Sequence, residues 1–110
     1  MSRNRGRVDT NQTEIVATLR LLGCSVVSLS PIGRGCPDLA VAVGGKTYLI
    51  EVKDGSKPWK LTDDQKEFIL NWKAEIPVLE SIDDAYYFVE SVRNNKLVEW
   101  IRSKILDREK

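Results

Sequence analysis

Residues 38–53 read Asp-Leu-Ala-Val-Ala-Val-Gly-Gly-Lys-Thr-Tyr-Leu-Ile-Glu-Val-Lys, and this stretch decides the fold. Two runs rich in β-formers flank Gly44-Gly45, and a glycine pair in this position is typical of a two-residue hairpin turn. Such a turn pairs Val43 with Lys46 and fixes the register of the whole hairpin. The sequence therefore predicts two antiparallel strands, Asp38–Val43 and Lys46–Lys53.

This register places Asp38 directly opposite Glu51, with Cβ atoms about 4.5–5.5 Å apart on one face of the sheet. Lys53 shares that face because side chains alternate along a strand. The other face is apolar and is expected to be core; it carries Leu39, Val41, Val43, Tyr48, Ile50 and Val52. The hairpin thus brings two carboxylates and one ammonium together beside a hydrophobic surface.

Like charges directly opposed are destabilising, so the carboxylate pair favours a cation between them. Oxygen ligands without histidine or thiolate suit Mg²⁺. Lys53 could then position or deprotonate a water, or neutralise charge on a phosphate. The alternative is a surface ladder of ion pairs, which is common and weak. Pro37, which fixes the chain entering the strand, and the glycine-rich loop around Arg34 favour the metal site.

Outward from the hairpin, the pattern predicts the element order α-β-β-β-α-β-α-α. This order is typical of an α/β fold with a mixed β-sheet core flanked by helices. The remaining expected elements are helices over 9–22, 62–74, 83–93 and 97–106, and strands over 24–29 and 77–79. The second of these helices carries Phe68, Ile69 and Trp72 on one face, and the last is expected to point Trp100, Ile101 and Ile105 inward.

The chain has 110 residues, no histidine and two cysteines. Every mechanism with a histidine base or ligand is therefore excluded, and two cysteines are too few for a cysteine-only zinc site or a disulfide framework. We find no apolar stretch that could span a bilayer and no signal sequence, so we expect no membrane partner and a cytoplasmic location.

The formal net charge is +1, but the charges are unevenly distributed. Residues 1–60 are net basic and residues 61–110 net acidic. We expect residues 1–8 to form a flexible basic arm and residues 9–110 a single domain. A near-neutral protein can bind nucleic acid through one basic face, although the arm alone equally fits a solvated terminus. The candidate nucleic-acid-binding residues are Arg3, Arg5, Arg7, Arg34, Lys57 and Lys60.

Pro37-Asp38 followed by Glu51-Val52-Lys53 resembles the signature of the PD-(D/E)XK nuclease superfamily. Residues 35–39 and 49–53, followed by Leu61-Thr62 and Gln65, resemble more specifically its VRR-NUC branch. Within that branch the similarity is to small stand-alone members of the kind found in phages. The resemblance covers roughly residues 9–92 and implies a restriction-endonuclease-like core.

The resemblance also implies roles for individual residues. Asp38, Glu51 and the main-chain carbonyl of Val52 would hold Mg²⁺, for which Mn²⁺ could substitute. Lys53 would be the catalytic lysine, Glu14 an additional acidic residue near the metal, and Gln65 the residue that orients lysine, water or phosphate. Two of these have structural alternatives: Thr62-x-x-Gln65 is also a helix capping box, and Glu14 equally suits the first turn of a capped helix.

We therefore expect a metal-dependent endonuclease that hydrolyses DNA phosphodiester bonds. The resemblance implies a homodimer acting on branched DNA such as a four-way (Holliday) junction, encoded by a phage in a bacterial host. Two alternatives remain: a non-catalytic nucleic-acid-binding module on the same fold, and a structural partner protein that binds through exposed tyrosines and its acidic C-terminal half. Trp59 either stacks on a base or packs.

Overall fold

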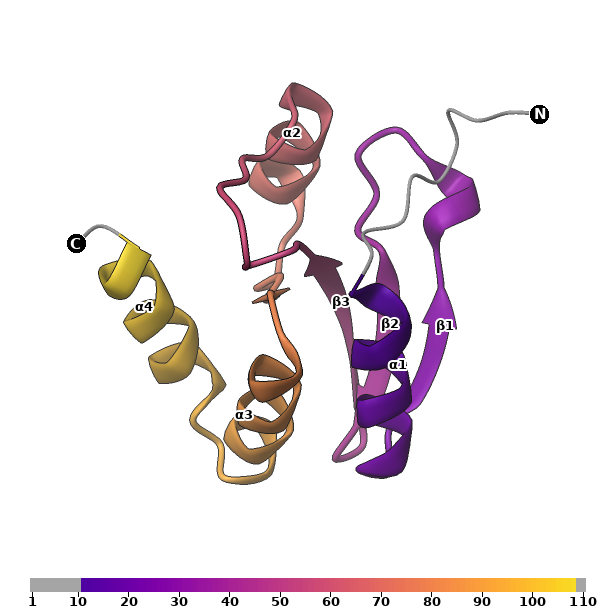
Figure 1. Cartoon of the computed structure of the whole chain (residues 1–110), viewed down its shortest axis with the longest axis vertical. Coiled ribbons are helices and arrows are strands. Elements are labelled where there is room, and N and C mark those ends of the chain that lie inside the picture. Colours follow the sequence, from indigo (N-terminus) through magenta and orange to yellow (C-terminus); the bar gives the residue numbers. More distant parts are fainter. Residues whose placement is uncertain (1–10, 109–110) are drawn as a thin grey trace.

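The computed structural model describes residues 11–108. Within these residues, one sheet is flanked by four α-helices in the predicted order (Figure 1). The elements are α1 (Gln12–Leu21), β1 (Ser25–Ser28), the short 3₁₀ helix η1 (Ser30–Ile32), β2 (Leu39–Val43), β3 (Lys46–Val52), α2 (Asp63–Asn71), β4 (Val78–Leu79), α3 (Ile82–Arg93) and α4 (Leu97–Arg108). The predicted basic arm, residues 1–8, lies outside the described residues.

The sheet has the strand order β1-β2-β3-β4. The pairs β1–β2 and β2–β3 are antiparallel, and β3–β4 is parallel. Val43 pairs with Lys46 and Leu39 with Ile50, so the predicted hairpin register is confirmed. Gly44 and Gly45 both have positive φ, at 63° and 80°, which explains why glycines occupy this turn.

The hydrophobic core lies between one face of the sheet and helices α1 and α3 (Figure 1). Ile15 and Leu19, one helical turn apart, bring α1 onto this face, and Gly23 follows the end of α1 with φ 95°. Phe88 of α3 meets the ring of Tyr48 edge-on, with ring centroids 5.6 Å apart. The face of the hairpin predicted to be core is the buried one. The opposite face is therefore the one that carries Glu51.

Helix α2 departs from the sequence prediction. The expected helix over 62–74 carries Phe68, Ile69 and Trp72 on one face, but α2 ends at Asn71 and has no buried residue. Phe68 and Trp72 stack on each other instead, with ring centroids 5.4 Å apart. Helix α2 lies at the end of the molecule towards which β3 points (Figure 1). Its first turn contacts Gly35, Glu51 and Lys53 through Asp64 and Gln65.

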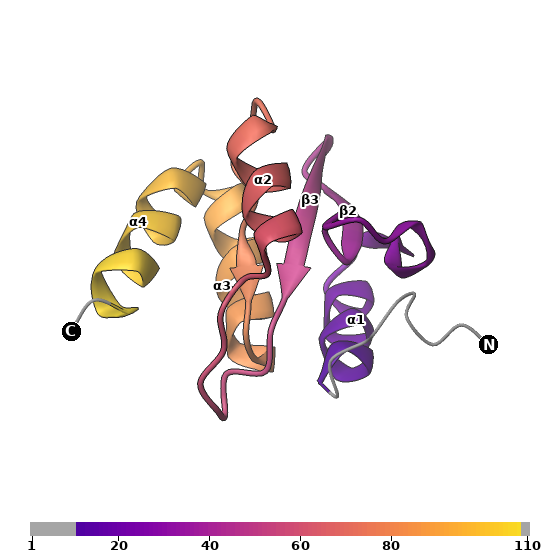
Figure 2. The ribbon, with the colours of Figure 1, turned by 90° about the horizontal axis from the view of Figure 1, so that it is seen from above.

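Helix α4 lies beyond α3, on the opposite side of β3 from α1 (Figure 2). Trp100 and Ile101 are half-buried, whereas Ile105, which we expected to point inward, is 52% exposed. No helix among the described residues is long and apolar enough to cross a membrane.

Candidate metal and phosphodiesterase site

Asp38 and Glu51 meet at the end of the hairpin. Asp38 directly precedes β2, and the pairing of Leu39 with Ile50 brings it beside Glu51. Asp38 Oδ2 accepts a hydrogen bond of 2.7 Å from the main-chain N–H of Val52. Glu51 is only 2% exposed and Asp38 is half-buried, so the ion pair of Glu51 with Lys53 does not lie on the open surface, as the alternative of a surface ladder expects.

The surroundings of Glu51 disfavour its negative charge. Burial raises the pKa of this carboxyl group to about 8, assisted by the charge of Asp38 and a hydrogen bond with it, while Lys53 partly opposes the shift. Without a cation, the carboxyl pair holds a proton over a wide pH range. A divalent cation between the oxygens would replace that proton. The donor set therefore fits a hard metal ion such as Mg²⁺.

The main chain of Val52 adds a third oxygen on the same side. The N–H and C=O of one strand residue point to the same side of the strand. Because the Val52 N–H points to Asp38, its carbonyl is directed towards the Asp38 side of β3 as well. Among residues 11–108, no three acidic or cysteine side chains are grouped so that they could hold a metal. An ion here would need the carbonyl, waters or substrate oxygens to complete its coordination.

Lys53 and Gln65 complete the site. Lys53 Nζ lies 3.6 Å from Glu51 Oε2 and donates a hydrogen bond of 3.1 Å to Gln65 Oε1. Gln65 Nε2 donates a hydrogen bond of 3.1 Å to Glu51 Oε2. The amide of Gln65 thus bridges the ammonium and the carboxyl group, and it restricts the positions of both.

Gln65 also caps its own helix. Thr62 Oγ1 accepts a hydrogen bond from the N–H of Gln65, and Gln65 Oε1 accepts one of 2.9 Å from the N–H of Thr62. This is a complete capping box. The two interpretations of Gln65 are therefore compatible, because the same amide oxygen serves the cap and Lys53.

Gly35 allows the loop that leads to Asp38 to touch α2. Its φ is 78°, and a Cβ atom at this position would lie 2.3 Å from the main-chain oxygen of Asp64. No side chain fits in that space. Since α2 has no buried residue, this contact and the bonds of Gln65 are what fix its first turn over the site.

Glu14 does not lie in this cluster of contacts. It is exposed on α1 and lines a separate hollow with Asp54, Glu80 and Asp83, whose lining includes neither Asp38 nor Glu51. Its role at a metal remains a prediction.

Two amide side chains at the start of α1, those of Asn11 and Gln12, are less exposed than Glu14. Gln12 is 5% exposed, and its Oε1 has no hydrogen-bond partner within the described residues. Asn11 Nδ2 donates hydrogen bonds of 3.0 Å to the carbonyls of Lys53 and Glu80, joining the ends of β3 and β4. The sequence offered one signal for Gln12, since it shares the helical face of Ile15 and Leu19.

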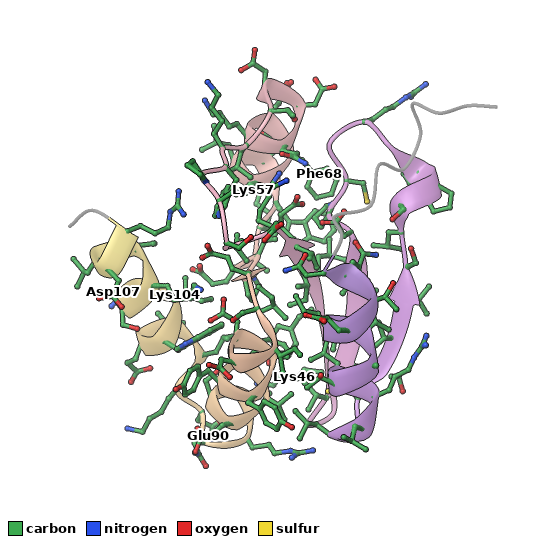
Figure 3. The ribbon with its side chains drawn as sticks, viewed as in Figure 1. Lys46, Lys57, Phe68, Glu90, Lys104 and Asp107 are labelled. Carbon is green, nitrogen blue, oxygen red and sulfur yellow. The ribbon has the colours of Figure 1, made fainter. Side chains whose placement is uncertain are left out.

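The candidate nucleic-acid-binding residues fall into two groups. Arg3, Arg5 and Arg7 lie outside residues 11–108. Arg34, Lys57 and Lys60 are exposed, on the loops that lead to Asp38 and away from Lys53 (Lys57 is labelled in Figure 3). Lys57 lies 4.0 Å from Asp54. These exposed cations flank the site in the sequence, and their contact with nucleic acid remains a prediction.

No family model matches the sequence, and no curated protein matches it. A solved structure described as a VRR_NUC domain is similar at 26% sequence identity and a TM-score of 0.55. The match covers 74% of this chain and 96% of that chain.

Over residues 11–108, the chain forms a nuclease-like α/β domain with a mixed four-stranded sheet. Within this class, the structural match supports its assignment to the VRR-NUC branch of the PD-(D/E)XK nucleases. The resemblance noted from residues 35–39, 49–53 and Gln65 is confirmed at the level of the fold.

Proposed function

We propose that this protein is a divalent-metal-dependent endonuclease that hydrolyses DNA phosphodiester bonds. One observation carries the proposal: the buried carboxyl group of Glu51 lies beside Asp38 and within contact of Lys53 and Gln65. A structural ion pair would not require a carboxyl group with this raised pKa. Perturbed acids beside a charged partner are instead characteristic of functional sites.

Each side chain has a role in this proposal. Asp38, Glu51 and the Val52 carbonyl would hold Mg²⁺ or Mn²⁺. When bound, the metal lowers the pKa of a water and stabilises charge on the phosphate. Lys53, 12% exposed, holds the attacking water or donates to a phosphate oxygen. Gln65 keeps the Lys53 ammonium beside Glu51 through its 3.1 Å hydrogen bond.

The test is cleavage of plasmid and oligonucleotide DNA with Mg²⁺, Mn²⁺ or EDTA. We expect metal-dependent cleavage that Lys53→Ala lowers by about 10²-fold or more. Lys46→Ala is the matched control, because Lys46 is an exposed lysine at the opposite end of β3. Equal cleavage by wild-type and Lys53→Ala proteins would remove Lys53 from the mechanism. Metal-independent binding without hydrolysis would indicate the non-catalytic module.

We further propose that the substrate is branched DNA and that the active form is a homodimer. Two copies related by a two-fold axis would place two sites for paired cuts across a junction. Four-way junction, flap, linear duplex and RNA substrates compared under one condition test the substrate. Sedimentation velocity tests the dimer, and a monomer that cuts duplex and junction at equal rates would contradict both.

A further inference from the structure

Trp59 lies in the segment between β3 and α2, and its half-buried ring contacts Lys53. Lys53 Nζ is 5.8 Å from the ring centroid, within the range in which the ring face attracts a cation. Gln65 and Glu51 contact the same ammonium group. Lys53 is therefore held between two polar groups and one aromatic surface.

The orientation of this ring is fixed by further contacts. Trp59 Nε1 donates a hydrogen bond of 2.9 Å to Glu80 Oε1. The guanidinium carbon of Arg108 lies 4.0 Å from the ring centroid. Since an indole has one polar donor and attracts cations at its faces, these contacts restrict both its tilt and its position.

Glu80 is itself anchored from two directions. Its carbonyl accepts hydrogen bonds from Asn11 Nδ2 and the N–H of Gly55, and its own N–H donates to Asp84. The side chain of Glu80 forms two ion pairs. Lys104 Nζ lies 3.1 Å from its Oε2, and Arg108 Nη1 lies 3.9 Å from its Oε1. Glu80 is thus a fixed point between β4 and α4.

The charge of Glu80 is stabilised by the same contacts. Burial alone would raise its pKa, but hydrogen bonds from Trp59 and Lys104, with the charges of Lys104 and Arg108, lower the pKa below its ordinary value. Glu80 therefore remains an acceptor for the indole N–H at neutral pH.

Helix α4 contacts this network through two basic side chains, Lys104 and Arg108, while its Trp100 packs against the core. Lys104 projects from α4 towards the body of the molecule (Figure 3). An apolar hollow of about 200 Å³, lined by Trp59, Val78, Trp100 and Ile105 among others, lies on this side of α4. Beside this hollow, the ion pairs of Lys104 and Arg108 with Glu80 connect α4 to the group that binds the Trp59 indole.

Resting on the proposed function, we propose that Trp59 is a positioning residue that holds Lys53 beside the Asp38–Glu51 pair. Helix α4 in turn holds Trp59 through Arg108 and Glu80. A lysine side chain is long and flexible. A fixed aromatic ring beside it reduces the number of conformers that compete with the one in which the ammonium lies beside the carboxyl pair. Of the two roles that the sequence allows for Trp59, this assignment takes packing, because the ring lies beside the site's lysine.

The experiment compares Trp59→Leu, Trp59→Phe and Arg108→Ala with the wild type, and Trp72→Leu as the control. Trp72 is a second half-exposed tryptophan whose ring stacks on Phe68. The readouts are kcat and KM for DNA cleavage, and the acylation rate of the Lys53 amine measured by peptide mass spectrometry without DNA. Thermal unfolding confirms that each variant is folded.

We expect Trp59→Leu to lower kcat by about tenfold or more with KM little changed, since small displacements of catalytic groups have large effects. Acylation of Lys53 should rise severalfold in this variant, because its ring no longer covers the amine. Trp59→Phe keeps a ring beside Lys53 and should retain most of kcat. Arg108→Ala, at an exposed position on α4, should show a smaller change in the same direction as Trp59→Leu.

An increase in KM with unchanged kcat would overturn the inference and make Trp59 a base-stacking residue. Unchanged acylation of Lys53 in Trp59→Leu would also overturn it, whatever the cleavage result. The proposed function fails separately, if the wild type does not cleave nucleic acid while its Lys53 acylation still depends on Trp59.

Discussion

The carboxylate of Asp38 accepts a hydrogen bond of 2.7 Å from the main-chain N–H of Val52. Asp38 lies just outside β2, and its side chain accepts this hydrogen bond from β3 beyond the last main-chain pair of the two strands, Leu39 with Ile50. The same carboxylate raises the pKa of Glu51. Asp38 therefore has two separable roles. Its hydrogen bond to Val52 stabilises the end of the hairpin, and its carboxylate adds negative charge to the candidate metal site.

Substitutions of Asp38 should separate these roles. Asp38→Asn keeps an oxygen that can accept from Val52 and should fold normally, but it should lose metal-dependent cleavage. Asp38→Ala leaves the N–H without its acceptor and should also lower the free energy of unfolding by about 1–2 kcal/mol. Chemical denaturation and cleavage assays check the pair of variants. Equal stability of the two variants would show that the hydrogen bond does not fasten the hairpin.

The pH dependence of stability follows from Glu51. Its pKa in the folded protein is about 8, above its value in the unfolded chain. The stabilisation from the protonated carboxyl group is complete below the unfolded pKa and is lost as pH rises through about 8. In EDTA, wild-type stability relative to Glu51→Gln should therefore fall from pH 5 to pH 8, by an amount on the order of a few kcal/mol.

Urea unfolding at several pH values measures this difference. Adding Mg²⁺ at pH 8 should stabilise the wild type but not Glu51→Gln, because only the wild type gains a ligand in its folded state. A pH-independent difference between the two proteins would contradict the raised pKa.

Gly35→Ala should displace α2. Gly33 provides the matched control, since it also has positive φ, at 68°, but a Cβ atom there would meet no atom within 4 Å. Both substitutions should cost about 1–2 kcal/mol for the backbone conformation. Only Gly35→Ala should also reduce cleavage, because the clash with Asp64 moves Gln65 away from Glu51 and Lys53. Equal kcat values for the two variants would show that α2 need not be held by this contact.

Thr62→Ala and Gln65→Ala should separate the capping and site roles of the capping box. Thr62→Ala removes the hydroxyl that caps α2 and should lower stability by about 1 kcal/mol with cleavage largely retained. Gln65→Ala removes the hydrogen bonds that link Lys53 and Glu51, and it should lower both the stability and the rate of cleavage. Thermal unfolding and kcat provide the two measurements. Equal losses of kcat in the two variants would mean that Gln65 acts only through its helix.

The Asp38–Glu51 pair could be predicted from the sequence because the register of the hairpin depends only on its turn residues and on the alternation of side chains along its strands. Two glycines with positive φ fix the turn, and the alternation of side chains then determines which residues share a face. The Asp38–Glu51 juxtaposition needs no further information. Gln65 was identified by resemblance, and its dual hydrogen bonding became visible only in the structure.

The parts that were not predicted depend on contacts between distant segments. The sequence places Phe68, Ile69 and Trp72 on one face of α2, but helical periodicity does not reveal which other elements pack against a helix, and no residue of α2 is fully buried. The contact between Arg108 and Trp59 joins residues 49 positions apart, and neither residue alone indicates it. Gln12 was missed because a glutamine in a first helical turn is usually solvated.

Binding of Mn²⁺ is the most direct test of the claim that Asp38 and Glu51 share one divalent cation. Titration followed by electron paramagnetic resonance should show binding to the wild type and to Glu90→Gln, whose carboxylate is exposed on α3 (Figure 3). Asp38→Asn and Glu51→Gln should each weaken binding by more than about tenfold. Undiminished Mn²⁺ binding to a folded protein that carries both substitutions would contradict the account.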